Sequence, residues 1–232
     1  AEAREVNIAF LTRMTRGTPW VRMKTAVTLD GRTAFPDGRS QWITGEAARA
    51  DVQFWRGRAG AVLTGIGTVL ADDPQMNVRL PDQERQPLRI VIDPRMETPP
   101  AGKLLTSKGG KVFIAAAAEY PTRRAALEAA GAEVWVLPDA AVPGRVDLRE
   151  LMRELAKREV NEVHVEAGPR LSGALFAAGL IDEMLFYYAP CLFGAGMGPA
   201  AVPLPAEPGA AYRWRLQSLD QIGGDFRVLL RR

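Results

Sequence analysis

The sequence predicts an α/β fold with a mainly parallel central sheet flanked by helices and an antiparallel hairpin at its C-terminal edge. The first observation is that short apolar runs alternate with helical segments between about residues 60 and 190. Strands that alternate with helices of about 10–15 residues indicate βαβ units and a parallel sheet. The second observation is that residues 212–232 hold two apolar runs around Gly223-Gly224, which is typical of a hairpin.

The first strand is expected at residues 20–29, "WVRMKTAVTL", where apolar and polar positions alternate. This period of two, with β-branched residues, is the pattern of a strand, and it puts Lys24 on the face opposite the apolar stripe. Residues 30–41 are rich in Gly, Asp and Pro and are expected to form a loop. Thr44 is the expected N-cap of a helix over about 45–59.

The remaining elements follow from the same patterns. Strands are expected at 60–64, 88–93, 111–116, 132–137, 160–168 and 181–190, and helices at 122–131, 146–159 and 170–179. Residues 1–19 have helical spacing of apolar side chains and are interpreted as a connecting arm, and residues 20–232 as one domain.

Composition narrows the class of function. The 232 residues are 47% hydrophobic and 25% charged, as in an ordinary globular domain, and the net charge is only +3. The basic residues are scattered, which favours an anionic small molecule over a nucleic acid as the ligand. No apolar run is long enough for a membrane helix. Cys191 is the only cysteine, so no internal disulfide can form, and a reducing cytoplasm is expected.

A zinc site is not expected. His164 and Glu166 in "HVE" match the first half of the zinc deaminase signature. However, the chain has one His and one Cys, which cannot supply the three nitrogen or sulfur ligands of such a site. We therefore predict no metal site.

The stretch "AVLTGIGTVLADDP" raises the possibility of a Rossmann phosphate loop at Gly65-Ile66-Gly67. The fingerprint requires a third small residue, but that position is Leu70, and Asp93 lies 28 residues after Gly65 instead of about 20. No helix of about ten residues fits before Pro74. The better interpretation is that these glycines let a strand end in a sharp turn.

A second glycine loop, "VEAGPRLSGALFAAG", is a stronger candidate. Gly168 follows a strand, and Pro169 suits the first turn of a helix. The free N–H groups of residues 170–174 would form an anion site, with Ser172 and the small Gly173 allowing close approach. The alternative is an ordinary strand-to-helix turn.

Four charged residues are further candidates, each with a plainer alternative. Glu166 at the end of a strand is either a site acid or a loop anchor, and Lys24 points either into a cleft or to solvent. Arg56 and Arg79 flank the first glycine loop and could bind phosphate, or they could be surface charges.

Taken together and in order, these segments resemble the reductase domain of the riboflavin-biosynthesis deaminase–reductase family. The matching stretches are "VRMKTAVTLDGRTA", "SQWIT", "TGIGTVLADDPQMNVR", "RIVID", "VEAGPRLSGALFAAGLIDE" and "APCLFG", and the resemblance spans about Val6 to Arg232. It implies a dihydrofolate-reductase-like α/β fold that uses NADPH. The implied reaction reduces the ribose of 5-amino-6-(5-phosphoribosylamino)uracil to a ribityl chain.

The resemblance also implies site residues. The implied NADPH contacts are Ala26, Trp42, Thr68, Asp72, Asp93, Pro94, Gly168, Pro169, Arg170, Leu171, Ser172, Gly173 and Ala174. The implied substrate contacts are Ser40, Arg56, Met76, Arg79 and Glu166. Relatives often have Leu in place of Met76, and a Ser that can bind the 2′-phosphate of NADPH in place of Pro94. Arg95 is a candidate for that contact here.

For the chemistry, we hypothesise that the glycosylamine opens to an imine and that hydride adds to C1′. Lys24 would stabilise charge or relay a proton, with Asp30 and Glu166 assisting. The resemblance further implies a homodimer, through the C-terminal strands or "LFYYAPCLFGAGMG", and a zinc deaminase domain joined in cis through the arm.

Two alternatives remain. One is a related reductase of the same fold that acts on the diaminopyrimidinone before deamination, although such enzymes have no deaminase to be tethered to. The other is a non-catalytic nucleotide-binding or dimerisation module. That module would be expected to lack Lys24, Glu166 or the Gly168 loop, and all three are present.

Overall fold

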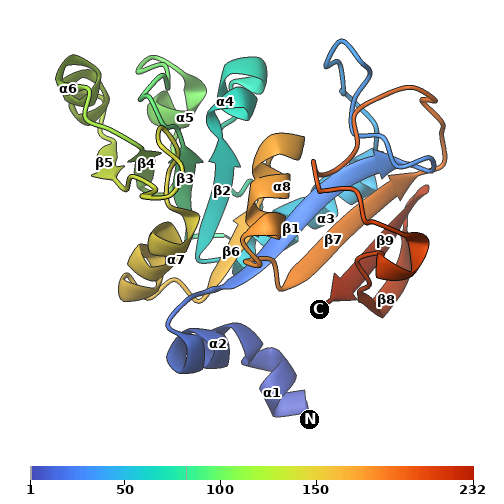
Figure 1. Cartoon of the computed structure of the whole chain (residues 1–232). Coiled ribbons are helices and arrows are strands. Elements are labelled where there is room, and N and C mark those ends of the chain that lie inside the picture. The colour runs from blue at the N-terminus through green and yellow to red at the C-terminus, as the bar shows by residue number, and fades with distance from the viewer. Residues whose placement is uncertain (1, 82) are drawn as a thin grey trace. The chain divides into compact units, whose positions relative to one another are not determined.

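The computed structural model describes residues 2–81 and 83–232 (Figure 1). The chain forms two compact units, which are treated separately below. Unit 1 consists of Ala1–Trp20 and Gln53–Val165, and unit 2 of Val21–Val52 and Glu166–Arg232. The predicted arm starts at Ala1, which lies outside the described residues.

Unit 1 contains five parallel strands in the order β5-β4-β3-β2-β6. The strands are β2 (Ala61–Gly65), β3 (Leu88–Ile92), β4 (Val112–Ala116), β5 (Glu133–Val136) and β6 (Glu162–Val165). The helices are α1 (Glu2–Val6), α2 (Ile8–Arg16), α4 (Ile66–Asp72), α5 (Lys103–Thr106), α6 (Pro121–Ala129) and α7 (Leu148–Lys157).

The core of unit 1 explains why these strands read as continuous apolar runs. A sheet covered on both faces leaves no side of a strand for solvent, and β2, β3 and β4 are buried almost throughout. Asp147 is the N-cap of helix α7, and its carboxylate accepts hydrogen bonds from the N–H groups of Arg149 and Glu150. The core cluster consists of Val62, Val69, Met76, Val91, Met96, Leu104, Val112, Ile114, Ala116, Leu127, Ala132 and Val134.

Unit 2 contains the strand order β1-β7-β9-β8, with β1 parallel to β7 and the last pairs antiparallel. Its elements are β1 (Trp20–Thr28, except its first residue), α3 (Glu46–Arg58, as far as Val52), α8 (Pro169–Ala177), β7 (Glu183–Ala189), η1 (Pro208–Ala210), β8 (Arg215–Ile222) and β9 (Asp225–Arg231). The hairpin turns at Gly223, whose φ of 63° suits glycine.

A buried ion triad joins three strands of unit 2. Arg22 of β1 is opposite Glu183 of β7, and Glu183 is opposite Arg231 of β9. One carboxylate oxygen of Glu183 accepts a hydrogen bond from Arg22, and the other accepts one from Arg231 at 2.7 Å. Glu183 has no exposed surface, so its charge depends on these two guanidinium groups.

Most predicted elements are confirmed, including the mainly parallel strands with helices between them and the antiparallel C-terminal hairpin. The sequence did not indicate α4 and α5, because each is too short for a helical period to show in its apolar residues. The prediction that Thr44 caps α3 is wrong by one residue, since the helix begins at Glu46, directly after Gly45. The Gly45 N–H instead donates to the Asp225 carboxylate at 2.7 Å.

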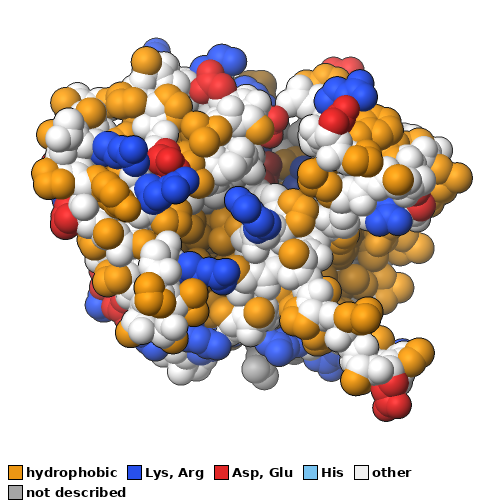
Figure 2. All heavy atoms as spheres, turned by 45° about the horizontal axis from the view of Figure 1, so that its top comes forward, with side chains coloured by type: hydrophobic (Ala, Val, Ile, Leu, Met, Phe, Trp, Pro, Cys, Tyr) orange, Lys and Arg blue, Asp and Glu red, His pale blue; other side chains and the backbone are white. Residues whose placement is uncertain are grey.

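Surface features agree with the sequence composition. On the face seen in Figure 2, Lys and Arg side chains are scattered among hydrophobic ones and do not gather into a stripe. Within the described part of the chain, no helix has the length and apolar character required to cross a membrane.

The triad generates a stability prediction. In Glu183→Gln, two largely buried guanidinium groups lose the counter-charge that they share, and we expect the free energy of unfolding to fall by about 3–5 kcal/mol. Urea denaturation measures this change. The control is Glu97→Gln, which breaks the exposed ion pair with Arg95 and should change the same free energy by less than about 1 kcal/mol. Equal effects for both variants would contradict the assigned role of the triad.

Candidate functional site

The sequence-predicted site residues fall in both units, and each group is described within its own unit. In unit 2, Lys24 and Ala26 lie on the same face of β1, because they are two residues apart. Ala26 is opposite Tyr187 of β7 in the parallel register, and Lys24 is opposite Leu185. The Lys24 Nζ atom lies 5.9 Å from the centre of the Tyr187 ring, within the range of a cation–π interaction.

Tyr187 is at the centre of a polar network that no sequence pattern indicated. Its hydroxyl donates to Asp51 of α3 at 2.6 Å. The guanidinium of Arg227 on β9 donates to both oxygens of Asp51, at 3.0 and 2.9 Å, and to Asp220 at 2.9 Å. Ser218 completes the network by donating to Asp220.

Glu166 acts on the same tyrosine through its charge. Burial and the hydrogen bond to Asp51 raise the pKa of Tyr187 well above its ordinary value, and the negative charge of Glu166 adds to that increase. The hydroxyl therefore stays protonated at physiological pH. Unit 2 thus places Lys24 beside a neutral, fully buried Tyr187, and the charge of Glu166 acts on the same tyrosine.

Asp30, the third predicted catalytic residue, holds a loop in place. One carboxylate oxygen accepts from the Thr28 hydroxyl and the Phe193 N–H, and the other accepts from the Gly194 N–H at 2.7 Å. The Thr28 hydroxyl, together with these backbone groups, lowers the pKa of Asp30. This is the arrangement of a loop anchor, and a direct catalytic role for Asp30 stays a prediction.

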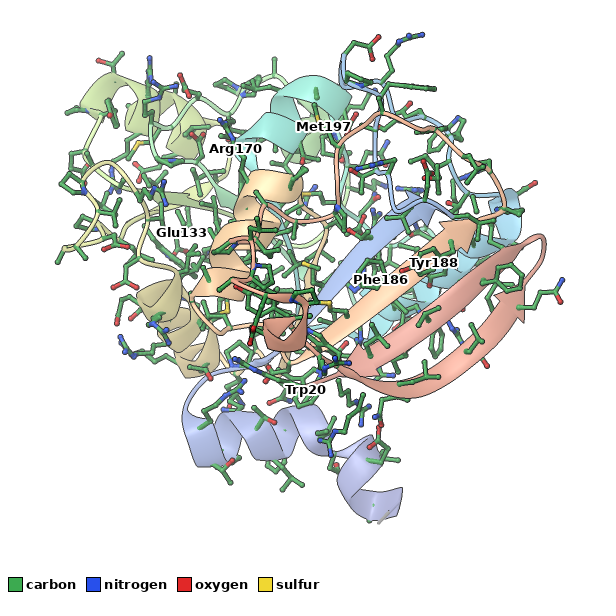
Figure 3. The ribbon with its side chains drawn as sticks, turned by 45° about the vertical axis from the view of Figure 1, so that its right-hand side comes forward. Trp20, Glu133, Arg170, Phe186, Tyr188 and Met197 are labelled. Atoms are coloured by element: carbon green, nitrogen blue, oxygen red, sulfur yellow. The ribbon has the colours of Figure 1, made fainter. Side chains whose placement is uncertain are left out.

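The N-terminal end of α8 is open. Gly168 precedes the helix in an extended conformation, is exposed, and makes no side-chain capping hydrogen bond, and Pro169 occupies the first turn. The backbone N–H groups of a first helical turn have no acceptor within the helix. Those of Arg170 and Leu171 are therefore candidates to bind an anion. Arg170 lies at this end of the helix (Figure 3).

Close packing of a neighbouring segment leaves no room for a side chain at Gly173. A Cβ atom at this position would lie 2.2 Å from the carbonyl oxygen of Ala201, and the Ala201 N–H donates to the Pro169 carbonyl at 2.9 Å. The segment around Ala201 therefore lies directly on α8, which is sufficient to require glycine. Ligand contacts at Ser172, Gly173 and Ala174 stay predictions.

The other predicted residues of unit 2 lie in the loop before α3. Ser40 is half-buried. Trp42 is 72% exposed, and the Arg49 guanidinium lies 4.7 Å from the centre of its ring. An exposed indole supported from behind by a cation has a face available for stacking on a ligand.

In unit 1, the first glycine loop does not need the backbone freedom of glycine that was expected at Gly65 and Gly67. Gly65 has φ −110° and ψ 159°, which any residue can adopt, and Gly67 does not have a positive φ. The strand does turn directly into α4 at Gly65, as predicted, but the backbone conformation at this turn does not require glycine. A Cβ atom at Gly67 would meet nothing within 4 Å, so this glycine leaves open space beside Thr68 in the first turn of α4. Asp72, the last residue of α4, is exposed.

The loop of residues 75–79 contains two predicted substrate contacts. Met76 is buried and has a positive φ of 53°, and Arg79 is exposed. Arg56 of α3 donates to the Asn77 carbonyl at 3.1 Å, and Arg79 donates to the Asn77 side-chain oxygen at 3.2 Å. Unit 1 therefore brings Arg56 and Arg79 to the same asparagine.

Polar side chains hold the backbone of this loop. Gln86 accepts from the Val78 N–H at 2.9 Å and donates to the Val78 carbonyl at 3.0 Å, as a neighbouring strand would. Gln53 accepts from the Arg79 N–H at 3.0 Å. The buried Arg89 donates to the carbonyls of Gln75, Leu104 and Gly110.

Asp93 and Pro94 follow β3. The Asp93 carboxylate is fully buried and accepts hydrogen bonds from the N–H and the hydroxyl of Thr98. It shapes the turn that carries Pro94 and Arg95. The Arg95 guanidinium is exposed and paired with Glu97, and the Arg95 carbonyl accepts from Arg123.

Several residues that build these arrangements were missed by sequence reasoning. Tyr187 stands in the apolar run "EMLFYYA", where it looks like an ordinary core residue, and Asp51 and Arg227 look like surface charges. Strand register places Ala26 opposite Tyr187 and Tyr187 opposite Arg227, and the packing of α3 adds Asp51. The glutamines that hold residues 75–79 carry no sequence signal of their own.

The chain matches a protein-family model and is similar in sequence to known proteins. The protein-family model described as the RibD C-terminal domain matches residues 19–228. A riboflavin biosynthesis protein RibD from Haemophilus influenzae is 37% identical over 244 residues, covering 98% of this chain and 62% of that protein. The chain belongs to the RibD C-terminal domain family.

Solved structures of RibD proteins agree with this membership. The RibD of Acinetobacter baumannii is 36% identical, with a TM-score of 0.87, and the match covers 99% of this chain and 62% of that one. A Thermotoga maritima structure is 26% identical, with a TM-score of 0.82, over 99% of this chain and 61% of that one. That protein is named a diaminohydroxyphosphoribosylaminopyrimidine deaminase/5-amino-6-(5-phosphoribosylamino)uracil reductase.

These matches confirm the family and the dihydrofolate-reductase-like α/β fold that the resemblance implied. The chain spans less than two thirds of the length of the RibD relatives. Membership of the RibD C-terminal domain family explains why the matching segments occur in this order along the chain. The roles of individual residues rest on the contacts described above.

The loop of residues 75–79 generates the second prediction. Gln86→Met has a similar size but cannot hydrogen-bond the Val78 N–H and carbonyl, so we expect unfolding to become easier by about 1–3 kcal/mol. We also expect faster amide hydrogen exchange at residues 76–79, measured by mass spectrometry. Gln217→Met, at an exposed position, is the control and should change neither quantity. Unchanged exchange in Gln86→Met would show that Gln86 does not hold this loop.

Proposed function

We propose that this protein is an NADPH-dependent reductase of 5-amino-6-(5-phosphoribosylamino)uracil, acting in riboflavin biosynthesis. The observation that carries the proposal is the position of the half-buried Lys24 beside Tyr187, in a chain that belongs to the RibD C-terminal domain family. A half-buried ammonium is suited to stabilise charge and to move a proton at a reacting carbon. The Thermotoga maritima relative is named for this same reaction.

The residues present fit a dinucleotide. The open N-terminal end of α8 offers backbone N–H groups to the pyrophosphate, and its nine residues give a helix dipole of the right sign. Within unit 2, the exposed ring of Trp42 also offers a stacking surface. Considered by itself, unit 1 has open space at Gly67, beside the predicted contact Thr68. When bound, NADPH supplies the hydride. Ala26, Asp72, Asp93 and Pro94 stay predicted contacts, and Arg95 is the candidate for the 2′-phosphate.

Arg56 and Arg79 suit the phosphate of the substrate. Both guanidinium groups hydrogen-bond Asn77, so they lie within reach of one small anion. Arginine binds phosphate with several N–H groups at once. Met76 and Ser40 are proposed to contact the remainder of the substrate, and Glu166 to contact the substrate as well as assist Lys24.

For the chemistry, we propose that Lys24 acts at the ribose C1′, where charge changes as the glycosylamine opens to an imine and is reduced. The ammonium would stabilise that charge or pass a proton to it, and Glu166 would assist. Asp30 would contribute through the loop that it holds between Thr28 and Gly194.

We propose a homodimer through the outer face of the C-terminal strands. Strand pairing places Leu219 beside Val228 and Val228 beside Phe186, so these side chains share one face, and Leu216, Leu219 and Phe226 of that face are exposed. Phe186 and Tyr188 lie on this side of β7, with ring centres 5.7 Å apart (Figure 3). The face consists of Met184, Phe186, Tyr188, Leu216, Leu219, Phe226, Val228 and Leu230. A second copy is the proposed occupant, because exposed apolar area on a sheet next to an edge strand favours self-association.

We also propose that residues 1–19 connect to a zinc deaminase domain in cis, as in full-length RibD proteins. The relatives are longer than this chain, and the apolar side chains of Val6 and Met14 on α1 and α2 are exposed and could pack on another domain. We also propose that the protein is located in the cytoplasm.

The function is tested by measuring NADPH oxidation at 340 nm with the freshly deaminated pyrimidine as substrate. We expect turnover by the wild-type protein, and none by Lys24→Met, which keeps the length of the side chain but lacks the ammonium. NADPH should still bind to Lys24→Met, measured by quenching of tryptophan fluorescence, because the proposed cofactor contacts are unchanged.

Turnover by Lys24→Met at the wild-type rate would contradict the role of Lys24. Faster reaction with the diaminopyrimidinone than with the deaminated pyrimidine would favour the alternative substrate. No quenching by millimolar NADPH, together with no turnover, would favour a non-catalytic module.

The dimer is tested by Leu219→Lys, which places a charge in the middle of the outer face. Leu219 is 61% exposed, so the variant should fold, and we expect its mass by light scattering to fall to that of one chain. The control is Leu204→Lys, at an apolar residue that is 93% exposed and outside the face, which should leave a dimer. A dimer that persists in Leu219→Lys would exclude this face as the contact.

A further inference from the structure

Tyr187 is a large side chain that faces Lys24 within unit 2, and the function proposed above assigns it no step in the reaction. Its ring is fully buried, and the Lys24 Nζ atom lies 5.9 Å from the ring centre. An aromatic face attracts a cation, and the attraction depends on the position of the ring beneath it. The position of Lys24 is therefore sensitive to whatever holds the ring of Tyr187.

Three groups hold that ring. The Tyr187 hydroxyl donates to one oxygen of Asp51 at 2.6 Å. Arg227 donates to both oxygens of Asp51, which prevents the carboxylate from turning away. Arg227 is in turn held by Asp220, so the anchor of Tyr187 extends across α3, β9 and β8.

The same groups keep the hydroxyl from ionising. Desolvation of the phenol and the adjacent Asp51 charge both raise the pKa of Tyr187, so a negatively charged oxygen does not form there. Tyr187 consequently acts on Lys24 through its ring and not as a counter-ion. This is a positioning role, separate from the chemistry of Lys24 itself.

We infer that Tyr187, anchored by Asp51 and Arg227, is a positioning residue that fixes the ammonium of Lys24 at the place where it acts. The inference rests on the proposed function of Lys24 for its catalytic consequence, but the position of Lys24 can be measured without any reaction. The chain has only five lysines, which makes such a measurement practical.

The experiment uses reductive methylation with ¹³C-formaldehyde, which labels each lysine and keeps its positive charge. The methyl signal of Lys24, identified by its absence in Lys24→Met, should lie upfield because of the Tyr187 ring current. In Tyr187→Leu, the methyl signal of Lys24 should move to the chemical shift of the Lys103 methyl signal, because the Lys103 side chain is 60% exposed. Lys111 is the internal control, since its Nζ atom lies 5.2 Å from the Phe113 ring, and its signal should not move.

Two milder variants keep the inference testable if Tyr187→Leu does not fold. Tyr187→Phe keeps the ring and removes its anchor, and Asp51→Asn weakens the contact with Arg227. In each, the Lys24 signal should move part of the way toward that of Lys103. An unchanged Lys24 signal in the folded variants would overturn the inference.

Kinetics provide the second measurement. With NADPH and the deaminated pyrimidine, Tyr187→Leu should lower kcat about tenfold, with the KM of both substrates and NADPH quenching within about twofold of the wild type. Tyr187→Phe should restore most of kcat. A rise in KM with unchanged kcat would show that Tyr187 supports binding and would overturn the positioning role. If the wild-type protein has no turnover, the proposed function fails, while the methyl signals still decide whether Tyr187 positions Lys24.

Discussion

The parallel register between β1 and β7 is the constraint on which the chemistry of unit 2 depends. Side chains along a strand alternate between faces, so one register decides which residues of the two strands meet. Here it places Arg22 opposite Glu183 and Ala26 opposite Tyr187 on a single face. A slip of one residue would expose the buried Glu183 and would separate Lys24 from the Tyr187 ring. The ion triad therefore stabilises the same register that forms the candidate site.

The antiparallel partner strand extends this arrangement. In β9, Arg231 and Arg227 are four residues apart, as are Glu183 and Tyr187 in β7, so each arginine meets one of them. Arg231 compensates the charge of Glu183, and Arg227 holds Asp51 against the Tyr187 hydroxyl. The C-terminal hairpin thus contributes to the site through the second of these contacts, and its opposite face remains apolar and exposed.

Polar side chains help to hold the loops that carry candidate ligand contacts. Asp30 accepts hydrogen bonds from two backbone N–H groups of the segment that follows β7, and Gln86 bonds the backbone of Val78 on both sides. Buried backbone groups require partners, and polar side chains supply them where no strand is available. These loops are therefore ordered before any ligand arrives, which reduces the entropy lost on binding.

The sequence by itself determined the order and type of nearly all the elements, because the periods of apolar residues and the Gly and Pro breaks are local signals. It also determined the family, and it pointed to Lys24, Glu166 and the Gly168 loop as candidates. It could not supply the reason for individual glycines: Gly65 adopts an ordinary conformation, and Gly173 is small because Ala201 lies against it. Nor could it reveal Tyr187, Asp51 and Arg227 as neighbours of Lys24. They stand up to 203 positions apart from it along the chain, and only strand register and the packing of α3 bring their side chains together. The physical reason is that propensity and periodicity act over a few residues, whereas ion pairs, hydrogen bonds and cation–π contacts depend on distances that tertiary structure sets.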